Sequence, residues 1–390
     1  MNLLGEPEQA NWQRVFHKMA PGDEYPLPNV RGASTGATRR RVPRITPGGD
    51  SVIDVRALWK VFGADTATAL RLAGEGAERS AIQTATGCTV GVRDVSFAVA
   101  KGETFVVMGL SGSGKSTLIR CLSGLHDITS GDVTIDGQSL VGISADSLRS
   151  LRRSKMAMVF QNFGLFPHRR VIDNVAYGLE VQGVGKAERR RRAGEVVELV
   201  GLSGWASHFP DQLSGGMQQR VGLARALTLD PEILFFDEPF SALDPLIRRD
   251  MQDELLRLQR ELRRTIVFIT HDFAEAIRLG DRIAVMKDGV LEQIGTPEAV
   301  VTRPATPYVH AFTRDVPKLK VIRAHTIMRA SEGSSPTRTV SPDTLAENLI
   351  PLFLEEAGPI GVVDASGSLL GMVTIDDFRQ LVGDDAPVPA

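Results

Sequence analysis

The sequence is poor in cysteine, in long apolar runs and in net charge, and each shortage excludes a class of protein. Two cysteines, Cys88 and Cys121, cannot form the disulfide framework of a secreted scaffold. No apolar run approaches the roughly 20 residues of a membrane-spanning helix, and the first residues lack the layout of a signal peptide. A formal net charge of −2 does not indicate a protein that coats nucleic acid. We therefore expect a soluble, cytosolic protein that binds no nucleic acid.

The length and composition indicate more than one domain. A chain of 390 residues suits two or three domains, and 42% apolar residues suffice for a buried core. Residues 1–50 are rich in Pro, Gly and Arg and show no periodicity, which predicts a disordered extension. The extension carries an arginine cluster that either contacts anionic lipid or belongs to a solvated tail. The cluster consists of Arg39, Arg40, Arg41 and Arg44.

From residue 51 onward, short apolar strands alternate with amphipathic helices. This alternation predicts a parallel sheet with helices on its faces. Residues 283–286 and 290–294, joined at Asp288 and Gly289, predict a β-hairpin. The predicted strands are 51–58, 92–99, 104–108, 233–236 and 266–270, and the predicted helices are 67–81, 116–125, 186–200, 247–263 and 273–279.

A glycine-rich loop lies between the predicted strand 104–108 and the predicted helix 116–125. It reads Gly-Leu-Ser-Gly-Ser-Gly-Lys-Ser-Thr, and its glycines allow backbone N–H groups to point at phosphates. The following helix adds its positive end. We expect Lys115 to reach the β- and γ-phosphates and Ser116 to bind Mg²⁺. The candidate phosphate-binding residues are Gly109, Ser111, Gly112, Ser113, Gly114, Lys115, Ser116 and Thr117.

Two carboxylates follow the apolar strand at residues 233–236. Asp237 is placed to hold Mg²⁺, and Glu238 is placed to activate the attacking water as a general base. Paired acids that follow a phosphate loop in an α/β chain indicate hydrolysis of a nucleoside triphosphate.

The run at residues 213–220, Leu-Ser-Gly-Gly-Met-Gln-Gln-Arg, resembles the signature of the ABC ATPases. The resemblance implies that Ser214, Gly215, Gly216 and Gln218 bind the ATP held by another subunit, just before a helix at residues 217–227. It therefore implies a head-to-tail homodimer, with each ATP between one subunit's phosphate loop and the other's signature.

The same resemblance assigns four further residues. Gln161 would sense Mg²⁺ and the attacking water, and Asp244 would communicate across the dimer. His271 would be the switch histidine at the γ-phosphate, and Phe62 would stack on adenine. The alternative for a lone histidine is a purely structural role.

The resemblance implies a RecA-like α/β nucleotide-binding domain at residues 51–315, with an antiparallel β subdomain. A helical insertion would occupy about 64–90 and a helical subdomain about 162–225. Such boundaries are predicted only to within a few residues. The domain would work at the cytoplasmic face of the membrane, on a separate permease subunit.

Three segments are similar to the importers of quaternary amines, which take up glycine betaine, proline betaine, carnitine or choline. They are the run at 244–259, the run at 161–168 and the insertion that follows Gly63. The resemblance implies ATP-driven uptake of such solutes, with a substrate-binding protein as an indirect partner. The alternatives are the motor of an exporter or of another importer, a non-transport ABC ATPase, and a protein that no longer hydrolyses ATP.

The C-terminal piece, residues 321–383, resembles a single cystathionine-β-synthase-type (CBS) α+β unit. Residues 359–374 predict two strands around an Asp-x-x-Gly turn, with a helix at 375–381. Gly371, Thr374 and Asp377 match the run that binds adenosyl ligands in such units. The alternative is a small packing domain that binds nothing.

Overall fold

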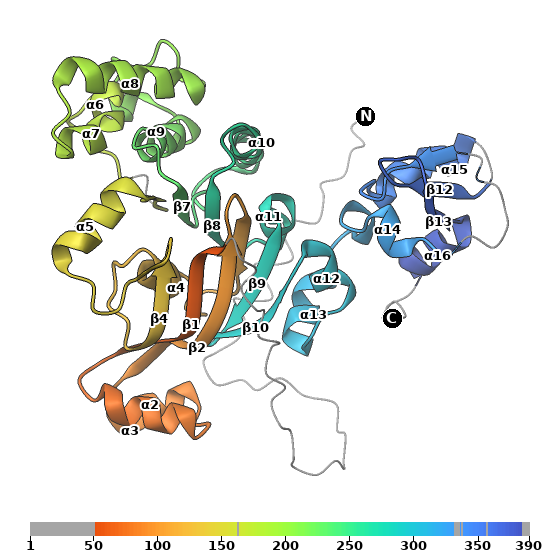
Figure 1. Ribbon diagram of the computed structural model, residues 1–390, viewed down its shortest axis with the longest axis horizontal. Helices are drawn as coiled ribbons and strands as arrows, with labels where there is room; N and C mark the ends of the chain where they lie inside the picture. The colour runs from red at the N-terminus through yellow and green to blue at the C-terminus, as the bar shows by residue number, and fades with distance from the viewer. Residues whose placement is uncertain (1–50, 162–163, 331–335, 337, 356–357, 384–390) are drawn as a thin grey trace, which may run out of the picture. The chain divides into compact units, whose positions relative to one another are not determined.

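The computed structural model describes residues 51–161, 164–330, 336, 338–355 and 358–383. The predicted extension at residues 1–50 lies outside the described residues, as does the start of the predicted helical subdomain, 162–163. The strands are β1 Ser51–Phe62, β2 Thr89–Ala100, β3 Thr104–Met108, β4 Ser130–Ile135, β5 Gln138–Ser139, β6 Met156–Val159, β7 Ile233–Asp237, β8 Thr265–Thr270, β9 Arg282–Lys287, β10 Val290–Gly295, β11 Arg338–Val340, β12 Ile360–Val363 and β13 Leu369–Val373. The α-helices (Figure 1) are α2 Thr66–Gly74, α3 Arg79–Thr86, α4 Lys115–Leu122, α5 Ala145–Ser154, α6 Val171–Val175, α7 Tyr177–Val181, α8 Lys186–Leu199, α9 Gly215–Leu227, α10 Pro245–Leu262, α11 Phe273–Leu279, α12 Pro297–Thr302, α13 Pro307–Thr313, α14 Ala324–Ile327, α15 Ile350–Glu355 and α16 Ile375–Gly383.

A six-stranded sheet carries the phosphate loop and the paired acids. Its order is β10-β9-β3-β8-β7-β6, and all neighbours are parallel except β9 and β10. Every residue of β3, β7 and β8 is buried, as expected for central parallel strands. Because these strands are parallel, their carboxyl ends meet at one edge of the sheet, where ligands of open α/β sheets bind.

A second, antiparallel sheet has the order β2-β1-β4-β5. The predicted hairpin is confirmed as β9 and β10, which are antiparallel. Asp288 and Gly289 both have positive φ values, 48° and 83°, as the tight turn between two strands requires.

The prediction of one helix over residues 67–81 is wrong. Two helices, α2 and α3, occupy this insertion, and the chain turns between them. Gly76 has a φ of 96°, a left-handed conformation that an α-helix does not allow. The apolar periodicity continued through the turn because Ala77 packs with the same insertion core as α2.

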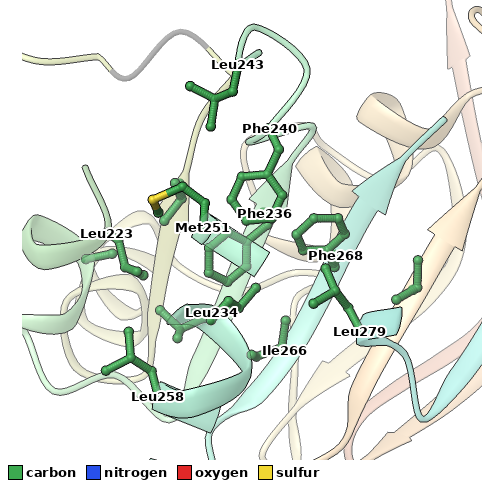
Figure 2. Packing of buried hydrophobic residues seen from close by; sticks show 14 of the residues in the cluster. Leu223, Leu234, Phe236, Phe240, Leu243, Met251, Leu258, Ile266, Phe268 and Leu279 are labelled. Carbon is green, nitrogen blue, oxygen red and sulfur yellow. The ribbon is translucent and has the colours of Figure 1, made fainter. Parts of the chain in front are cut away.

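The six-stranded sheet has a hydrophobic core on each face. Val106, Phe236 and Phe268 belong to the cluster that includes residues of α9, α10 and α11. Phe105 and Phe235, one position earlier on their strands, belong to the cluster shared with β1, β2 and α4. Figure 2 shows Phe236 and Phe240 close to Phe268, with ring centroids 5.7 and 5.6 Å from that of Phe268. This two-sided packing holds the loop-bearing edge in place.

The predicted strands and helix of the C-terminal piece are also present. Strands β11, β12 and β13 form a three-stranded sheet that leads into α16. Residues from Ile322 to Phe378 form a separate hydrophobic cluster. In the described part of the chain, no helix is both long and apolar enough to cross a bilayer.

Candidate functional site

The phosphate loop runs from the end of β3 to the start of α4, as the sequence predicts. Its glycines are required by close approaches of other backbone segments. A Cβ on Gly109 would lie 2.2 Å from the Met286 carbonyl oxygen, and one on Gly114 would lie 2.3 Å from that of Gly91. Both glycines also have positive φ values, 155° and 106°. Strands β2 and β9 therefore clamp the loop from outside.

Lys115 lies inside this loop and is only 4% exposed. Its ammonium donates to the carbonyl oxygens of Gly109 and Leu110, at 2.8 and 3.1 Å. Glu238 Oε1 lies 3.5 Å from Lys115 Nζ. Burial lowers the pKa of Lys115, and the carboxylate of Glu238 partly offsets this effect. The loop thus holds a buried cation where phosphates would bind.

Ser116 and Asp237 meet at the carboxyl end of β7. Ser116 Oγ donates to Asp237 Oδ1 at 2.9 Å, and Arg120 Nη2 lies 3.9 Å from Asp237 Oδ2. Asp237 is 6% exposed. Burial raises the pKa of Asp237, and the hydrogen bond from Ser116 opposes that rise. Two of the three residues predicted to contact a metal ion are therefore adjacent; the third is Gln161.

Glu238 and His271 form the next pair along the same sheet edge. His271 Nδ1 lies 2.9 Å from Glu238 Oε2, and His271 follows directly after β8. Glu238 has a φ of 47°, which is unusual for a residue other than glycine. Gln161 is exposed two residues beyond β6, whose partner in the sheet is β7. The predicted catalytic residues thus come from three neighbouring strands.

Ser113 gives an observation that fits a bound polyphosphate. Its residue is 5% exposed, yet its hydroxyl has no hydrogen-bond partner among the described residues. A buried hydroxyl without a partner is costly, and a phosphate oxygen in the loop would satisfy it. Ser111 and Gly112 form the exposed tip of the loop, and Thr117 is half-buried on the first turn of α4.

Phe62 ends β1 and is 38% exposed. Lys60 Nζ lies 5.0 Å from the centre of its ring, and the ring of His126 meets it at 5.4 Å. A Cβ on Gly91 would contact both Phe62 and Thr117, at 3.0 and 2.8 Å. The ring predicted to stack on adenine therefore lies beside the helix that follows the phosphate loop.

The signature residues lie at the start of α9. Ser214 is the helix N-cap, and its hydroxyl accepts from Met217 N at 3.4 Å. Gly216 faces Ile247, which leaves no room for a Cβ. Gln218 donates to the Pro210 and Leu213 carbonyls and so holds the preceding turn. Among the described residues, no hydrogen bond or ion pair joins residues 214–218 to the phosphate loop.

Asp244 caps α10. Its carboxylate accepts from the backbone of Leu246 and Ile247, at 3.1 and 3.0 Å. The residue is exposed, so its predicted partner across a dimer would meet a carboxylate already oriented by the helix.

Two residues near the loop had no signal in the sequence. Arg79, in the insertion, donates to the Gly112 carbonyl oxygen at 3.0 Å. The Tyr308 hydroxyl, on α13, lies 3.4 Å from both Leu110 N and the Met286 carbonyl oxygen. Both residues are distant from the loop in sequence, so their contacts with it could be found only in the tertiary structure.

The three regulatory candidates are engaged in local structure. The Thr374 N–H and hydroxyl donate to Asp377 Oδ2, at 2.8 and 2.6 Å. Asp377 is 5% exposed and forms an ion pair with Arg329. A Cβ on Gly371 would lie 2.7 Å from the Arg329 carbonyl oxygen. Thr374 and Asp377 therefore cap the start of α16, and Gly371 allows the backbone at Arg329 to pack closely.

Curated relatives match most of the chain. The sequence profile described as ABC transporter matches residues 92–241. The trimethylamine N-oxide transport system ATP-binding protein of Ruegeria pomeroyi is 52% identical, over 82% of this chain and 97% of that protein. The glycine betaine transport ATP-binding protein of Bacillus subtilis is 50% identical, over 85% of this chain and 78% of that protein.

Solved structures show the same fold. A dimeric bacterial ABC transporter cassette is 33% identical and has a TM-score of 0.53, over 63% of this chain and 98% of its own. A dimer of the same cassette with bound ADP and phosphate matches equally well, at 32% identity and a TM-score of 0.53. The chain has the ABC ATPase cassette fold, with its phosphate loop and paired acids at one sheet edge. It belongs to the ABC transporter family, as an ATP-binding and ATP-hydrolysing subunit.

Proposed function

We propose that this chain powers the uptake of small solutes that carry a methylated, positively charged nitrogen, such as glycine betaine, proline betaine, choline or trimethylamine N-oxide. The extent of similarity carries the proposal. Relatives named for trimethylamine N-oxide and glycine betaine match 82% and 85% of the chain. Relatives named for sulfate and for spermidine match 67% and 57%.

In the proposed reaction, Glu238 is the general base for the attacking water. Its carboxylate lies between the ammonium of Lys115 and the imidazole of His271, at 3.5 and 2.9 Å. Phosphate oxygens that enter the loop compete with Glu238 for Lys115, which leaves the carboxylate available to a water molecule. His271 then holds the carboxylate and reaches the γ-phosphate, and Gln161 orients the water.

Mg²⁺ is the proposed cofactor, and Ser116 and Asp237 are the residues that would hold it. Both offer oxygen ligands, which suit this hard cation, and they lie 2.9 Å apart. In the described part of the chain, no cluster of three His, Cys, Asp or Glu side chains could hold a metal by itself. This fits Mg²⁺, which is usually held by few protein ligands together with substrate phosphates. When bound, the ion would neutralise charge on the β- and γ-phosphates.

The proposed partners are a second copy of the chain and a membrane permease, with a substrate-binding protein as an indirect partner. Residues 214–218 make no described bond to the loop of their own chain, and the similar cassettes are dimeric. In a head-to-tail dimer, the exposed Ser214 would face the partner's ATP. The motor would then act as a peripheral subunit on the cytoplasmic face of the membrane.

The test is ATP-driven uptake in vesicles that contain this chain, its permease and its binding protein. We expect uptake of labelled glycine betaine, choline or trimethylamine N-oxide, and none of sulfate or spermidine. Glu238→Gln is the matched control, since it keeps the shape of the side chain but removes the base. It should lower the hydrolysis rate by about 100-fold or more while ATP still binds.

Two results would contradict the proposal separately. Uptake of sulfate or spermidine without any methylated amine would overturn the solute class but leave the motor intact. Hydrolysis by Glu238→Gln at the parent rate would overturn the role of Glu238 as the base.

A further inference from the structure

The insertion between β1 and β2 is a closed unit with a hydrophobic core of its own. Its buried residues, together with Val61 of β1 and Val90 of β2, form a cluster separate from the two cores of the main sheet. The ends of the insertion touch, because a Cβ on Gly63 would lie only 2.6 Å from Cys88 Sγ. The members of the cluster are Val61, Ala69, Ala73, Ile82, Cys88 and Val90. The insertion therefore has a defined structure and can hold a side chain at a fixed position.

That side chain is Arg79, the first residue of α3. Arg79 Nη1 donates to the Gly112 carbonyl oxygen at 3.0 Å, at the tip of the phosphate loop. Within the part of the chain that is described, the guanidinium makes no ion pair with a carboxylate. Its charge is therefore directed at the loop, and a hydrogen bond from a charged donor is stronger than one between neutral groups.

A series of hydrogen bonds links the insertion, through β2 and the β9–β10 turn, to the next residue of the loop. Arg93, on β2, donates to the Ala77 carbonyl oxygen at 3.0 Å and also bonds that of Ala73. The backbone N–H of Arg93 donates to Gly289 O at 2.7 Å, and Gly289 N donates to Ser113 O at 2.8 Å. The insertion and the β9–β10 turn thus hold two successive loop carbonyls, those of Gly112 and Ser113.

The orientation of these two carbonyls fixes the orientation of the next two backbone N–H groups, those of Ser113 and Gly114. A peptide bond is planar and trans, so its C=O and N–H point in opposite directions. When the Gly112 and Ser113 carbonyls are held from outside, the N–H groups of Ser113 and Gly114 are turned to the other side of their peptide planes. On that side the Ser113 N–H donates to the Leu110 carbonyl oxygen at 3.2 Å, so fixing the Gly112 carbonyl also fixes this turn of the phosphate loop.

We propose that Arg79 is a positioning residue for nucleotide binding, and that the insertion acts as a clasp on the phosphate loop. Arg79 acts through the Gly112 carbonyl, which it holds outward, so that the turn closed by the Ser113 N–H and the Leu110 carbonyl oxygen is formed before ATP arrives. The insertion would then border both ends of the nucleotide, because Phe62, the residue predicted to stack on adenine, directly precedes it and Arg79 lies within it.

The test is equilibrium binding of ATP with Mg²⁺ to the full-length chain. Arg79→Ala should raise the Kd for ATP by about fivefold or more, since it removes a charge-assisted hydrogen bond. Hydrolysis at saturating ATP should stay within about twofold, because Arg79 touches no reacting group. Arg79→Lys, which keeps a charged donor, should restore most of the affinity.

Hydrogen exchange separates positioning from general damage. We expect faster exchange in the peptide that covers residues 109–117 of Arg79→Ala, with unchanged exchange in α2. The matched control is Arg71→Ala in the same insertion, which removes an exposed ion pair with Glu75 and should leave the Kd unchanged. An unchanged Kd in Arg79→Ala, or equal loss in Arg79→Lys and Arg79→Ala, would overturn the proposal.

Discussion

At the scale of single residues, the site contains two ionisable side chains whose burial disfavours their charged forms. Lys115 and Asp237 are 4% and 6% exposed, and burial shifts the pKa of each toward its neutral form. The strongest opposition to the shift comes from Glu238 for Lys115 and from Ser116 for Asp237. In the proposed reaction, such groups gain new partners when a polyphosphate and Mg²⁺ bind, so part of the binding free energy would come from relief of this unfavourable burial.

Asp237 allows a prediction about stability and pH. Its pKa in the folded chain lies above the usual value of 3.8, so ionisation at neutral pH opposes folding. We expect Asp237→Asn to stabilise the chain by about 1 kcal/mol at neutral pH in the absence of Mg²⁺ and nucleotide. The gain should shrink as the pH falls toward 3.8, where the parent carboxyl also becomes neutral. Thermal unfolding across this range measures the effect.

The control for that experiment is Asp253→Asn, which changes an exposed carboxylate paired with Arg278. It should change stability by less than about 1 kcal/mol. The interpretation fails if Asp237→Asn destabilises the chain at neutral pH. Loss of Mg²⁺-dependent hydrolysis should accompany the gain in stability.

At the scale of elements, the phosphate loop depends on neighbours that clamp its backbone. The Gly91 carbonyl on β2 leaves no space for a side chain at Gly114, and the Met286 carbonyl on β9 leaves none at Gly109. Packed strands cannot move apart without opening the cores on which they rest. The packing of these strands therefore holds the loop in place at Gly109 and Gly114.

Gly114→Ala tests this dependence. The added Cβ would lie 2.3 Å from the Gly91 carbonyl oxygen, and the φ of 106° would also be strained. We expect a loss of about 3 kcal/mol in stability, together with loss of ATP binding. Gly137→Ala, in the β4–β5 turn, is the matched control: its φ is 78° and no atom lies within 4 Å of the added Cβ. It should cost only about 1 kcal/mol of backbone strain. Equal costs for the two variants, measured by chemical denaturation, would show that the clamp is unimportant.

At the scale of the whole molecule, the C-terminal unit is tied to the ATPase domain at α12. Glu298 accepts from the backbone N–H of Arg323 at 2.8 Å and lies 3.4 Å from His325 Nε2. The unit also exposes large apolar side chains, of which Leu354 is 82% exposed and Leu370 46%. A contiguous patch of such side chains would mark a site of association. We propose that the same unit of a second subunit covers it in the dimer, which follows the two-fold symmetry that homodimers favour.

Deletion of residues 322–390 tests a regulatory role for this unit. The deletion keeps Val321, which belongs to the core of the ATPase domain. Hydrolysis should remain within about twofold of the parent rate, because a regulatory unit shifts states without taking part in the reaction. Its dependence on ionic strength, or on an adenine-containing effector, should disappear. Uptake in vesicles over a salt series measures this, and parallel curves for the two proteins would leave the unit as a packing domain.

The sequence by itself predicted the reacting groups and the strands and helices that carry them. Lys115, Ser116, Asp237 and Glu238 lie where the strand-loop-helix and strand-acid patterns predict them, because these patterns depend on neighbours along the chain. The extents of β3 and α11 agree with prediction to the residue. Apolar periodicity is a local signal, and it failed where a glycine turn interrupted a continuous pattern, between α2 and α3.

Only the tertiary structure decided which distant segments support the site. Arg79 meets Gly112, and Tyr308 approaches Leu110, through contacts between elements far apart in the chain. The pairing of Thr374 with Asp377 likewise shows that a run typical of ligand binding also caps a helix. These contacts arise from the packing of whole strands and helices, and the free energy of that packing is shared among many residues. A pattern of a few residues therefore predicts the reacting groups, while the positions of their supports depend on the complete fold.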